Sequence, residues 1–174
     1  YITAVLDLTT TELADELVGG VFPAGPRRLE VAGAIGIPQV VSLGALDMVN
    51  FGPMDTVPPR FADRNLYQHN ASITLMRTTP EENAELGRRI ARKLNAAQGP
   101  VTLFVPLRGV SLIATEGGAF YDPEADAALF DALRQELDPK VDVRYVETDI
   151  NDPAFATAMA DQLHAYVTAA RAGK

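Results

Sequence analysis

The sequence contains no cysteine and no tryptophan, and only two of its 174 residues are histidines. The absence of cysteine excludes a disulfide-stabilised scaffold, a thiolate metal site and a cysteine nucleophile. Two histidines are too few for a histidine-rich zinc cage, and we predict no metal site.

Positive charge is also in short supply. The 15 lysines and arginines are outnumbered by 23 aspartates and glutamates, so the net charge is −8. This balance disfavours nucleic acid and anionic membranes as partners. The sequence shows neither an apolar run of about 20 residues nor a secretory leader pattern. We therefore expect a soluble, cytoplasmic protein.

The length and the 47% hydrophobic content suit one folded domain and exclude a disordered chain. Residues 1–174 are predicted to form a single α/β domain. The sequence opens inside an apolar, strand-like run without an initiator methionine. We expect it to be the C-terminal half of a longer two-part protein.

Short apolar runs alternate with amphipathic segments along the chain. Strands are predicted at residues 1–8, 37–43, 72–76, 101–107 and 141–146. Helices are predicted from Thr79, Asp122 and Asp152, each followed by proline, and over shorter stretches at residues 9–17 and 27–35. Residues 44–70 lack periodicity and are interpreted as one long, ordered loop.

The continuous apolar runs indicate strands that are buried on both faces, as in parallel sheets covered by helices. The predicted fold is a three-layer, Rossmann-like α/β domain with about five mostly parallel strands. Ligands of such sheets bind at the carboxyl ends of the strands, near a switch in strand order. The segments after the strands, at residues 8–12, 43–52, 77–79, 106–118 and 147–152, are therefore the places to search.

Three consecutive threonines, Thr9, Thr10 and Thr11, follow the first predicted strand. Hydroxyls and free backbone N–H groups at a helix start suit a phosphate or carboxylate. A plain helix cap at Thr9 is the alternative. Gly19 and Gly20 form a glycine turn that either admits a ligand close to the backbone or simply ends the helix.

Polar side chains also follow the second strand. Ser42, Asp47 and Asn50 supply a hydroxyl, an acid and an amide in one short stretch. They could bind a ribose, the water shell of Mg²⁺ or a polar substrate. Ordinary turn chemistry is the competing interpretation, and no G-x-S-x-G nucleophile elbow is present.

His69 and Asn70 lie in the long loop, near Arg60, Arg64 and Tyr67. His69 could act as an acid or base, or the loop could be held together by its own hydrogen bonds. The other histidine, His164, is interpreted as a flank residue of the last helix.

Arg77 follows a predicted strand and could clamp a phosphate or carboxylate in a bidentate fashion. A salt bridge to a nearby acid is the alternative. Arg108 and Ser111 follow the next strand in a similar way. The acidic residues around Asp122 and the basic residues from Arg88 to Lys93 are interpreted as helix-start and solvated helix-face residues.

Several stretches together resemble the Tm-1-like ATP-binding family, a resemblance that covers nearly the whole chain. They are DLTTTELADELVGG, AGPRRLEVAGAIGIPQVVSLGALDMVNFG, YQHN, TLMRTTPEENAELGRRIARKLN and PLRGVS. The family's domain consists of two α/β halves, and this chain resembles the second. The resemblance implies a nucleotide-binding, homodimeric α/β protein that binds ATP, with or without Mg²⁺.

The residues that the resemblance favours for nucleotide contact lie in the matching stretches. They are Thr9, Thr10, Thr11, Gly19, Gly20, Asp47, Asn50, His69, Asn70 and Arg77. Three functions remain open on the sequence. The chain could be a nucleotide-binding module, an assembly half-domain, or an enzyme for a small polar or carboxylated substrate with His69 or Asp47 as acid or base.

Overall fold

A computed structural model describes residues 2–172, which form two β-sheets and five α-helices. The first sheet is parallel, with its strands in the order β1-β2-β6-β7, and the second is antiparallel, in the order β3-β5-β4. The strands are β1 (Val5–Thr9), β2 (Gln39–Gly44), β3 (Met48–Phe51), β4 (Leu66–Asn70), β5 (Ile73–Arg77), β6 (Val101–Pro106) and β7 (Asp142–Val146).

The helices differ widely in length. They are α1 (Glu12–Val18), α2 (Val31–Ala34), α3 (Pro80–Asn95), α4 (Pro123–Glu136) and α5 (Pro153–Ala172). Three short 3-10 turns accompany them: η1 (Met54–Thr56), η2 (Pro59–Phe61) and η3 (Leu112–Ala114). None of the helices among the described residues is both long and apolar enough to cross a membrane.

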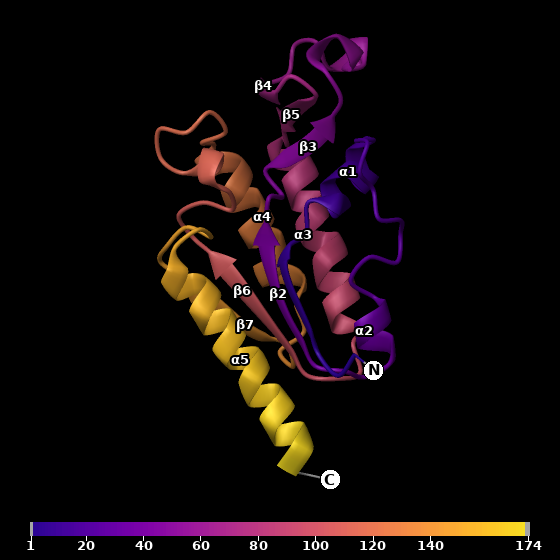
Figure 1. The fold of residues 1–174 in the computed structure, drawn as a ribbon, viewed down its shortest axis with the longest axis vertical. Helices are drawn as coiled ribbons and strands as arrows, with labels where there is room; N and C mark the ends of the chain where they lie inside the picture. The colour runs from indigo at the N-terminus through magenta and orange to yellow at the C-terminus, as the bar shows by residue number, and fades with distance from the viewer. Residues whose placement is uncertain (1, 173–174) are drawn as a thin grey trace.

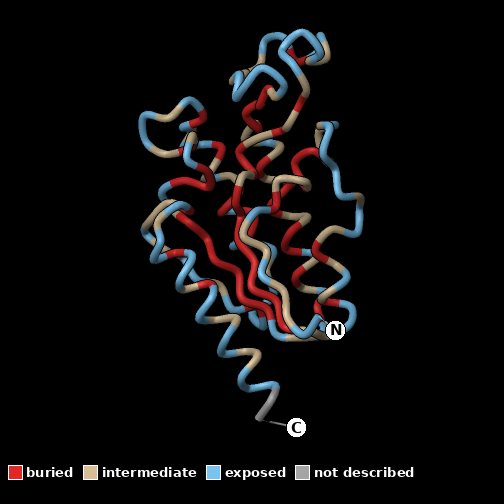
Figure 2. Tube along the Cα trace, in the orientation of Figure 1, coloured by how far each residue is buried: buried red, intermediate tan, exposed pale blue. Residues whose placement is uncertain are grey.

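Helices cover both faces of the parallel sheet, as predicted. Successive strand residues point to opposite faces, and Val40 and Val41 of β2 belong to different hydrophobic clusters. The Val41 cluster includes the buried faces of α3 and α4, whereas the Val40 cluster includes Phe155 and Met159 of α5. Figure 1 shows α5 in front of the sheet and α3 and α4 behind it, and Figure 2 shows β2 and β6 buried along their length.

The prediction of about five mostly parallel strands is corrected by the structure. Four strands are parallel, and the predicted strand at residues 72–76 is β5, the centre of the separate antiparallel sheet. The loop predicted over residues 44–70 contains β3 and β4, which pair with β5 on either side. β3 is only four residues long, and β4 has the polar sequence LYQHN, so neither produced a strand pattern.

The long helices α3 and α4 begin at the capping residues that the sequence predicts. Thr79 and Glu82 form the predicted capping box at α3, and the Asp122 side chain accepts the Ala125 N–H at α4. The start predicted at Thr9 is wrong because Thr9 pairs with Gly44 as part of β1, and α1 begins at Glu12. The stretch predicted over residues 27–35 is helical only in α2.

The four strands of the first sheet run parallel, so their carboxyl ends lie at the same end of the sheet. Figure 1 shows that β2 ends at the side of the sheet where the antiparallel sheet lies. The four strands follow one another across the sheet in chain order, so the switch in strand order that we expected is absent from residues 2–172. The carboxyl ends themselves still bring four post-strand segments to one rim of the sheet.

Candidate functional site

A small crevice opens at the carboxyl ends of β1, β2 and β6. Its volume is about 170 Å³, and its walls come from four segments that are far apart in the sequence. The lining residues are Leu8, Thr9, Gly44, Ala45, Val110, Ser111, Leu112, Ile150 and Asn151. The crevice lies at the carboxyl ends of the strands, as ligand sites of open α/β sheets do, but without the switch in strand order that accompanies such sites.

Backbone hydrogen bonds fix the walls of the crevice. The Ala45 N–H donates to the Val110 carbonyl at 2.8 Å, and the Ile150 N–H donates to the Gly109 carbonyl at 3.0 Å. Gly44 has no room for a side chain, because a Cβ there would collide with the Leu8 carbonyl and the Ile150 side chain. The glycine therefore lets β1, β2 and the segment after β7 approach closely.

Three polar side chains line the crevice. Within residues 2–172, the Thr9 hydroxyl and the Asn151 side-chain amide make no hydrogen bond to the protein, and both residues are exposed. Ser111 is buried, and its hydroxyl donates to Asp47 at 2.7 Å. Thr9 and Asn151 therefore offer open hydrogen-bonding groups, and Ser111 connects the crevice to the interior.

Asp47 lies behind Ser111 and has no exposed surface. Burial raises the pKa of its carboxyl group to about 6, although the Ser111 hydrogen bond and the charge of Arg77 act in the opposite direction. Its Oδ1 atom has no hydrogen-bond partner among the described residues. Asp47 is thus a buried acid that ionises near neutral pH and touches the crevice through one hydroxyl.

The other two threonines turn into the protein. Thr10 is fully buried, and its hydroxyl donates to the Ser42 carbonyl at 3.2 Å. The Thr11 hydroxyl accepts a hydrogen bond from the Asn50 side chain at 3.2 Å. Thr10 and Thr11 therefore join β1 and α1 to the β2–β3 region, while Thr9 alone faces the crevice.

Asn50 belongs to a cluster around Asp15, a residue that the sequence analysis missed. The buried Asp15 carboxylate accepts hydrogen bonds from the Asn50 and Phe22 backbone N–H groups, at 2.7 and 2.8 Å, and from the Asn50 side chain. Burial raises the pKa of Asp15 despite these bonds. Helical spacing places Asp15 on the side opposite Leu13 and Leu17, so the sequence contains no signal that it is buried.

The two predicted glycines belong to the same cluster. Gly19 ends α1 in the left-handed conformation, with φ +98°, as a helix C-cap does. A Cβ on Gly20 would collide with the Asp15 carboxyl group. In this structure both glycines shape the turn around Asp15, and neither lines the crevice.

Arg77 is buried inside the protein, with a side chain only 4% exposed. Its guanidinium donates to the Phe120 and Asp122 carbonyls, to the Thr78 hydroxyl and, at 2.6 Å, to Asp126. The salt bridge that we weighed against an anion clamp is therefore what this structure contains. Arg77 fastens the end of β5 to the start of α4.

His69 and Asn70 lie on β4, away from the crevice. Both are exposed at the edge of the antiparallel sheet. The Asn70 side chain accepts the Ser72 N–H, which closes the turn between β4 and β5. The predicted residues therefore separate into the crevice, the interior and this sheet edge, and the structure brings only Thr9 to the crevice.

A larger cavity, of about 600 Å³, lies on the other side of the segment that follows β6. Arg108, Thr115, Tyr121 and Asp149 are among its lining residues. The Arg108 side chain is 70% exposed, and Tyr121 is one of the exposed aromatic residues. This cavity and the crevice therefore share the segment after β6 as a common wall.

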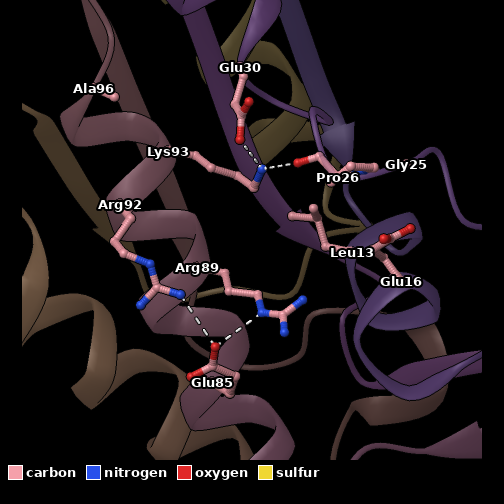
Figure 3. A pocket seen from close by; sticks show the side chains of 10 residues that line it. All are labelled: Leu13, Glu16, Gly25, Pro26, Glu30, Glu85, Arg89, Arg92, Lys93 and Ala96. Atoms are coloured by element: carbon pink, nitrogen blue, oxygen red, sulfur yellow. Dashed lines mark hydrogen bonds and ion pairs between the residues drawn. The ribbon is translucent and has the colours of Figure 1, made fainter.

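A third cavity, of about 410 Å³, lies between α1 and α3 (Figure 3). Each of its basic side chains has an acidic partner: Glu85 contacts Arg89 and Arg92, and Lys93 contacts Glu30 and the Pro26 carbonyl. The predicted solvated face of α3 thus forms one wall of a cleft. Its cations have acidic partners, and its lining residues lie away from the carboxyl ends of the parallel strands, so this cleft is the weaker candidate for an anion site.

No cluster of three acidic or histidine side chains suited to a metal ion occurs within residues 2–172. Polar groups at the crevice are hydroxyls, an amide and backbone atoms. This donor set suits a phosphate or another oxyanion better than a bare cation.

Comparison with known proteins identifies a family that this chain resembles. A family model described as "Uncharacterised protein family (UPF0261) C-terminal domain" matches residues 1–167. A UPF0261 protein of Clostridium tetani is 57% identical over 164 residues, which are 94% of this chain and 41% of the relative. A UPF0261 protein of Rhizobium meliloti is 51% identical over 90% of this chain and 40% of its own length.

A plant relative is more distant. The ToMV resistance protein Tm-1(GCR237) of Solanum lycopersicum is 44% identical over 163 residues, which are 92% of this chain and 22% of that protein. The chain therefore spans about two fifths of the length of these bacterial relatives and about a fifth of the tomato protein.

Proposed function

This chain belongs to the UPF0261 family, as its C-terminal domain, and from that premise we propose that it binds a nucleotide, ATP, at the carboxyl-end rim of its parallel sheet. The recognised relationship to the tomato Tm-1 protein is confirmed by the comparison. The names of the relatives do not state a ligand, so the nucleotide rests on the family resemblance and on the chemistry of the rim.

The observation that carries the proposal is the crevice beside Thr9, Ser111 and Asn151. Its polar side chains come from the last residue of β1 and from the segments after β6 and β7, so the fold gathers them from distant parts of the sequence. Hydroxyl and amide groups donate to phosphate oxygens without adding charge. The side chains of Thr9 and Asn151 make no competing hydrogen bond within the described residues, although their backbones do.

The crevice is large enough for only one part of a nucleotide. Its 170 Å³ is below the roughly 300–1,000 Å³ of typical small-molecule pockets. In our proposal a phosphate group lies in the crevice, and the rest of the ligand contacts Arg108 and Tyr121 in the larger neighbouring cavity. Arg108 pairs with Glu147 through its Nε atom at 3.3 Å, and this exposed ion pair leaves its other guanidinium N–H groups to the ligand. Magnesium bound to ATP keeps several waters and needs few protein carboxylates.

Calorimetric titration of ATP and Mg²⁺ into the full-length protein tests the proposal. Thr9→Val and Asn151→Ala remove the two open polar groups, and each is expected to weaken binding about tenfold, or about 1.4 kcal/mol. Thr157→Val is the matched control. Thr157 is exposed on α5, and within residues 2–172 its hydroxyl donates only to the Pro153 carbonyl of its own helix.

Two results would contradict the proposal. One is the absence of any heat or thermal shift when the full-length protein meets millimolar ATP. The other is tight ATP binding that neither Thr9→Val nor Asn151→Ala changes, because the ligand would then lie elsewhere.

A second candidate is an enzyme, and the Asp47–Ser111 hydrogen bond favours it. A carboxylate with a pKa of about 6 can accept the proton of the Ser111 hydroxyl at the crevice wall. His69, the other acid or base that we considered, lies on exposed β4. Asp47→Asn should lower nucleotide turnover by the full-length protein at least tenfold. The acid limb of its pH profile should also be lost. Unchanged turnover, or no turnover in the parent protein, would remove this candidate.

A further inference from the structure

The two edge strands of the parallel sheet differ in chemistry. β7 alternates charged and apolar residues, and its exposed Arg144 pairs with Asp142 at 3.0 Å and with Gln162 at 2.6 Å. Charged side chains of this kind protect an edge strand from pairing with another chain. β1 instead exposes Leu6 and carries only one charged residue, Asp7.

A groove of about 470 Å³ runs beside β1. Most of its lining is apolar and comes from β1, α2 and the segments on either side of α2. The apolar lining residues are Ile2, Val5, Ala24, Leu29, Val31, Ala32, Ile35 and Ile37. Arg28 lies at the rim, where it pairs with Asp7 at 2.6 Å and donates to the Thr9 carbonyl.

Exposed apolar side chains gather near this edge. Of the ten large hydrophobic residues exposed in the described part of the chain, Leu6 lies on β1, and Ile2, Val31 and Ile35 line the groove; Val31 and Ile35 are 59% and 64% exposed. Figure 1 shows α2 beside the lower half of β1. A contiguous apolar surface along an open strand edge typically marks an interface.

We propose that this face, the β1 edge with its groove, is the docking surface for the N-terminal domain of the same polypeptide. The family model that matches this chain is that of a C-terminal domain, and the matched part is about 40% of the bacterial relatives. The larger remainder of those proteins is long enough to supply a folded partner. Any segment joined ahead of residue 1 leaves beside Ile2, which lines the groove.

The backbone of β1 defines the contact further. β1 pairs only with β2, so its outer row of N–H and C=O groups has no strand partner within residues 2–172. The Thr9 carbonyl is already taken by Arg28. The Val5 N–H already bonds to the Pro38 carbonyl, and alternate residues of β1 face β2, so the outward backbone groups are those of Leu6 and Leu8. The N-terminal domain therefore has these two residues available for strand-type hydrogen bonds and the groove available for apolar side chains. This inference does not depend on nucleotide binding.

Hydrogen exchange in the full-length protein compares the two edges directly. If the N-terminal domain covers β1, nearly all amides of residues 5–9 exchange slowly. In β7, only about half of the backbone amides, those that face β6, should exchange slowly. The other amides point away from β6 and remain open to solvent, because no strand covers that edge. Equal, partial protection of both edge strands would overturn the proposal.

Paired substitutions then locate the contact. Val31→Glu with Ile35→Glu should release the domain, seen as at least a tenfold faster proteolytic cut between the domains and a larger radius of gyration. Met54→Glu is the control, because Met54 is also an exposed apolar residue but lies on η1, away from β1. Unchanged hydrogen exchange of α3 and β6 would show that the variants still fold.

A second copy of the chain is the competing occupant. If the double variant converts a dimer into a monomer by light scattering while the domains remain docked, the face is a homodimer interface and the proposal is wrong. Wild-type behaviour of the double variant in proteolysis, scattering and exchange would also overturn it.

Discussion

Thr9 and Thr10 are neighbouring residues of the same type, yet their side chains lie in different environments. The Thr9 side chain faces the crevice and makes no hydrogen bond within residues 2–172, whereas Thr10 is fully buried and bonded to the Ser42 carbonyl. The same division runs along the whole rim. Asp47, Asn50 and Arg77 turn inward, and Asn151 turns outward.

This division shows that a polar residue after a strand can stabilise the fold as readily as it can bind a ligand. Inward side chains satisfy buried backbone groups and one another, which an apolar interior demands. Outward side chains leave their hydrogen-bonding capacity to solvent or to a bound molecule. Substitutions should therefore separate the two sets: inward changes affect the free energy of unfolding, and outward changes affect binding.

The largest expected effect comes from the inward residue Arg77. Arg77→Ala leaves Asp126 and two carbonyls without their donor in a buried position, and we expect a loss of about 3–5 kcal/mol in the free energy of unfolding. Arg144→Ala breaks an ion pair whose side chains are more than 40% exposed, and should cost under about 1 kcal/mol. Chemical denaturation of both variants measures the difference. Equal losses would contradict the assignment of Arg77 to the scaffold.

The second effect concerns pH and Asp47. The pKa of its carboxyl is about 6 in the folded protein against 3.8 ordinarily, so the folded state holds more protons between these values. This group's stabilising contribution is complete below about pH 4 and falls by roughly 3 kcal/mol as pH rises through 6.

Asp47→Asn tests that sign. The variant should lose the downward slope of stability between pH 4 and 6 that the wild-type protein owes to this group, as measured by urea denaturation at each pH. Asp15 and Asp126 also have raised pKa values, so the difference between the two proteins is the informative quantity. Parallel stability curves would show that Asp47 ionises normally.

The smallest effect separates the neighbouring threonines. Thr10→Val removes a buried donor and should lower the free energy of unfolding by about 1 kcal/mol. Thr9→Val changes an exposed side chain and should stay within about 0.5 kcal/mol of the wild type. Thermal unfolding of the two variants side by side gives the comparison. A larger loss for Thr9→Val would reverse their roles.

The sequence predicted the parallel half of the fold well, for identifiable reasons. Leu86, Ile90 and Leu94 have the spacing of a buried helix face, and all three are fully buried. The Thr79 capping box marked the start of α3, and the apolar runs marked β2 and β6. These signals are local, so they need no knowledge of partners.

The antiparallel sheet and most of the site could not be predicted in the same way. The polar, largely exposed sequence of β4 predicts no strand. This segment is a strand because it pairs with β5. Whether Thr9 or Thr10 faces outward depends on packing against β2. Ser111 and Asn151 lie within post-strand segments that we had identified, but only the folded rim shows that they meet Thr9.

The most direct test is a crystal structure of the full-length protein grown with ATP and Mg²⁺. We predict phosphate density within hydrogen-bonding distance of Thr9, Ser111 or Asn151. Nucleotide density elsewhere, with only water between these three residues, would contradict the proposed site.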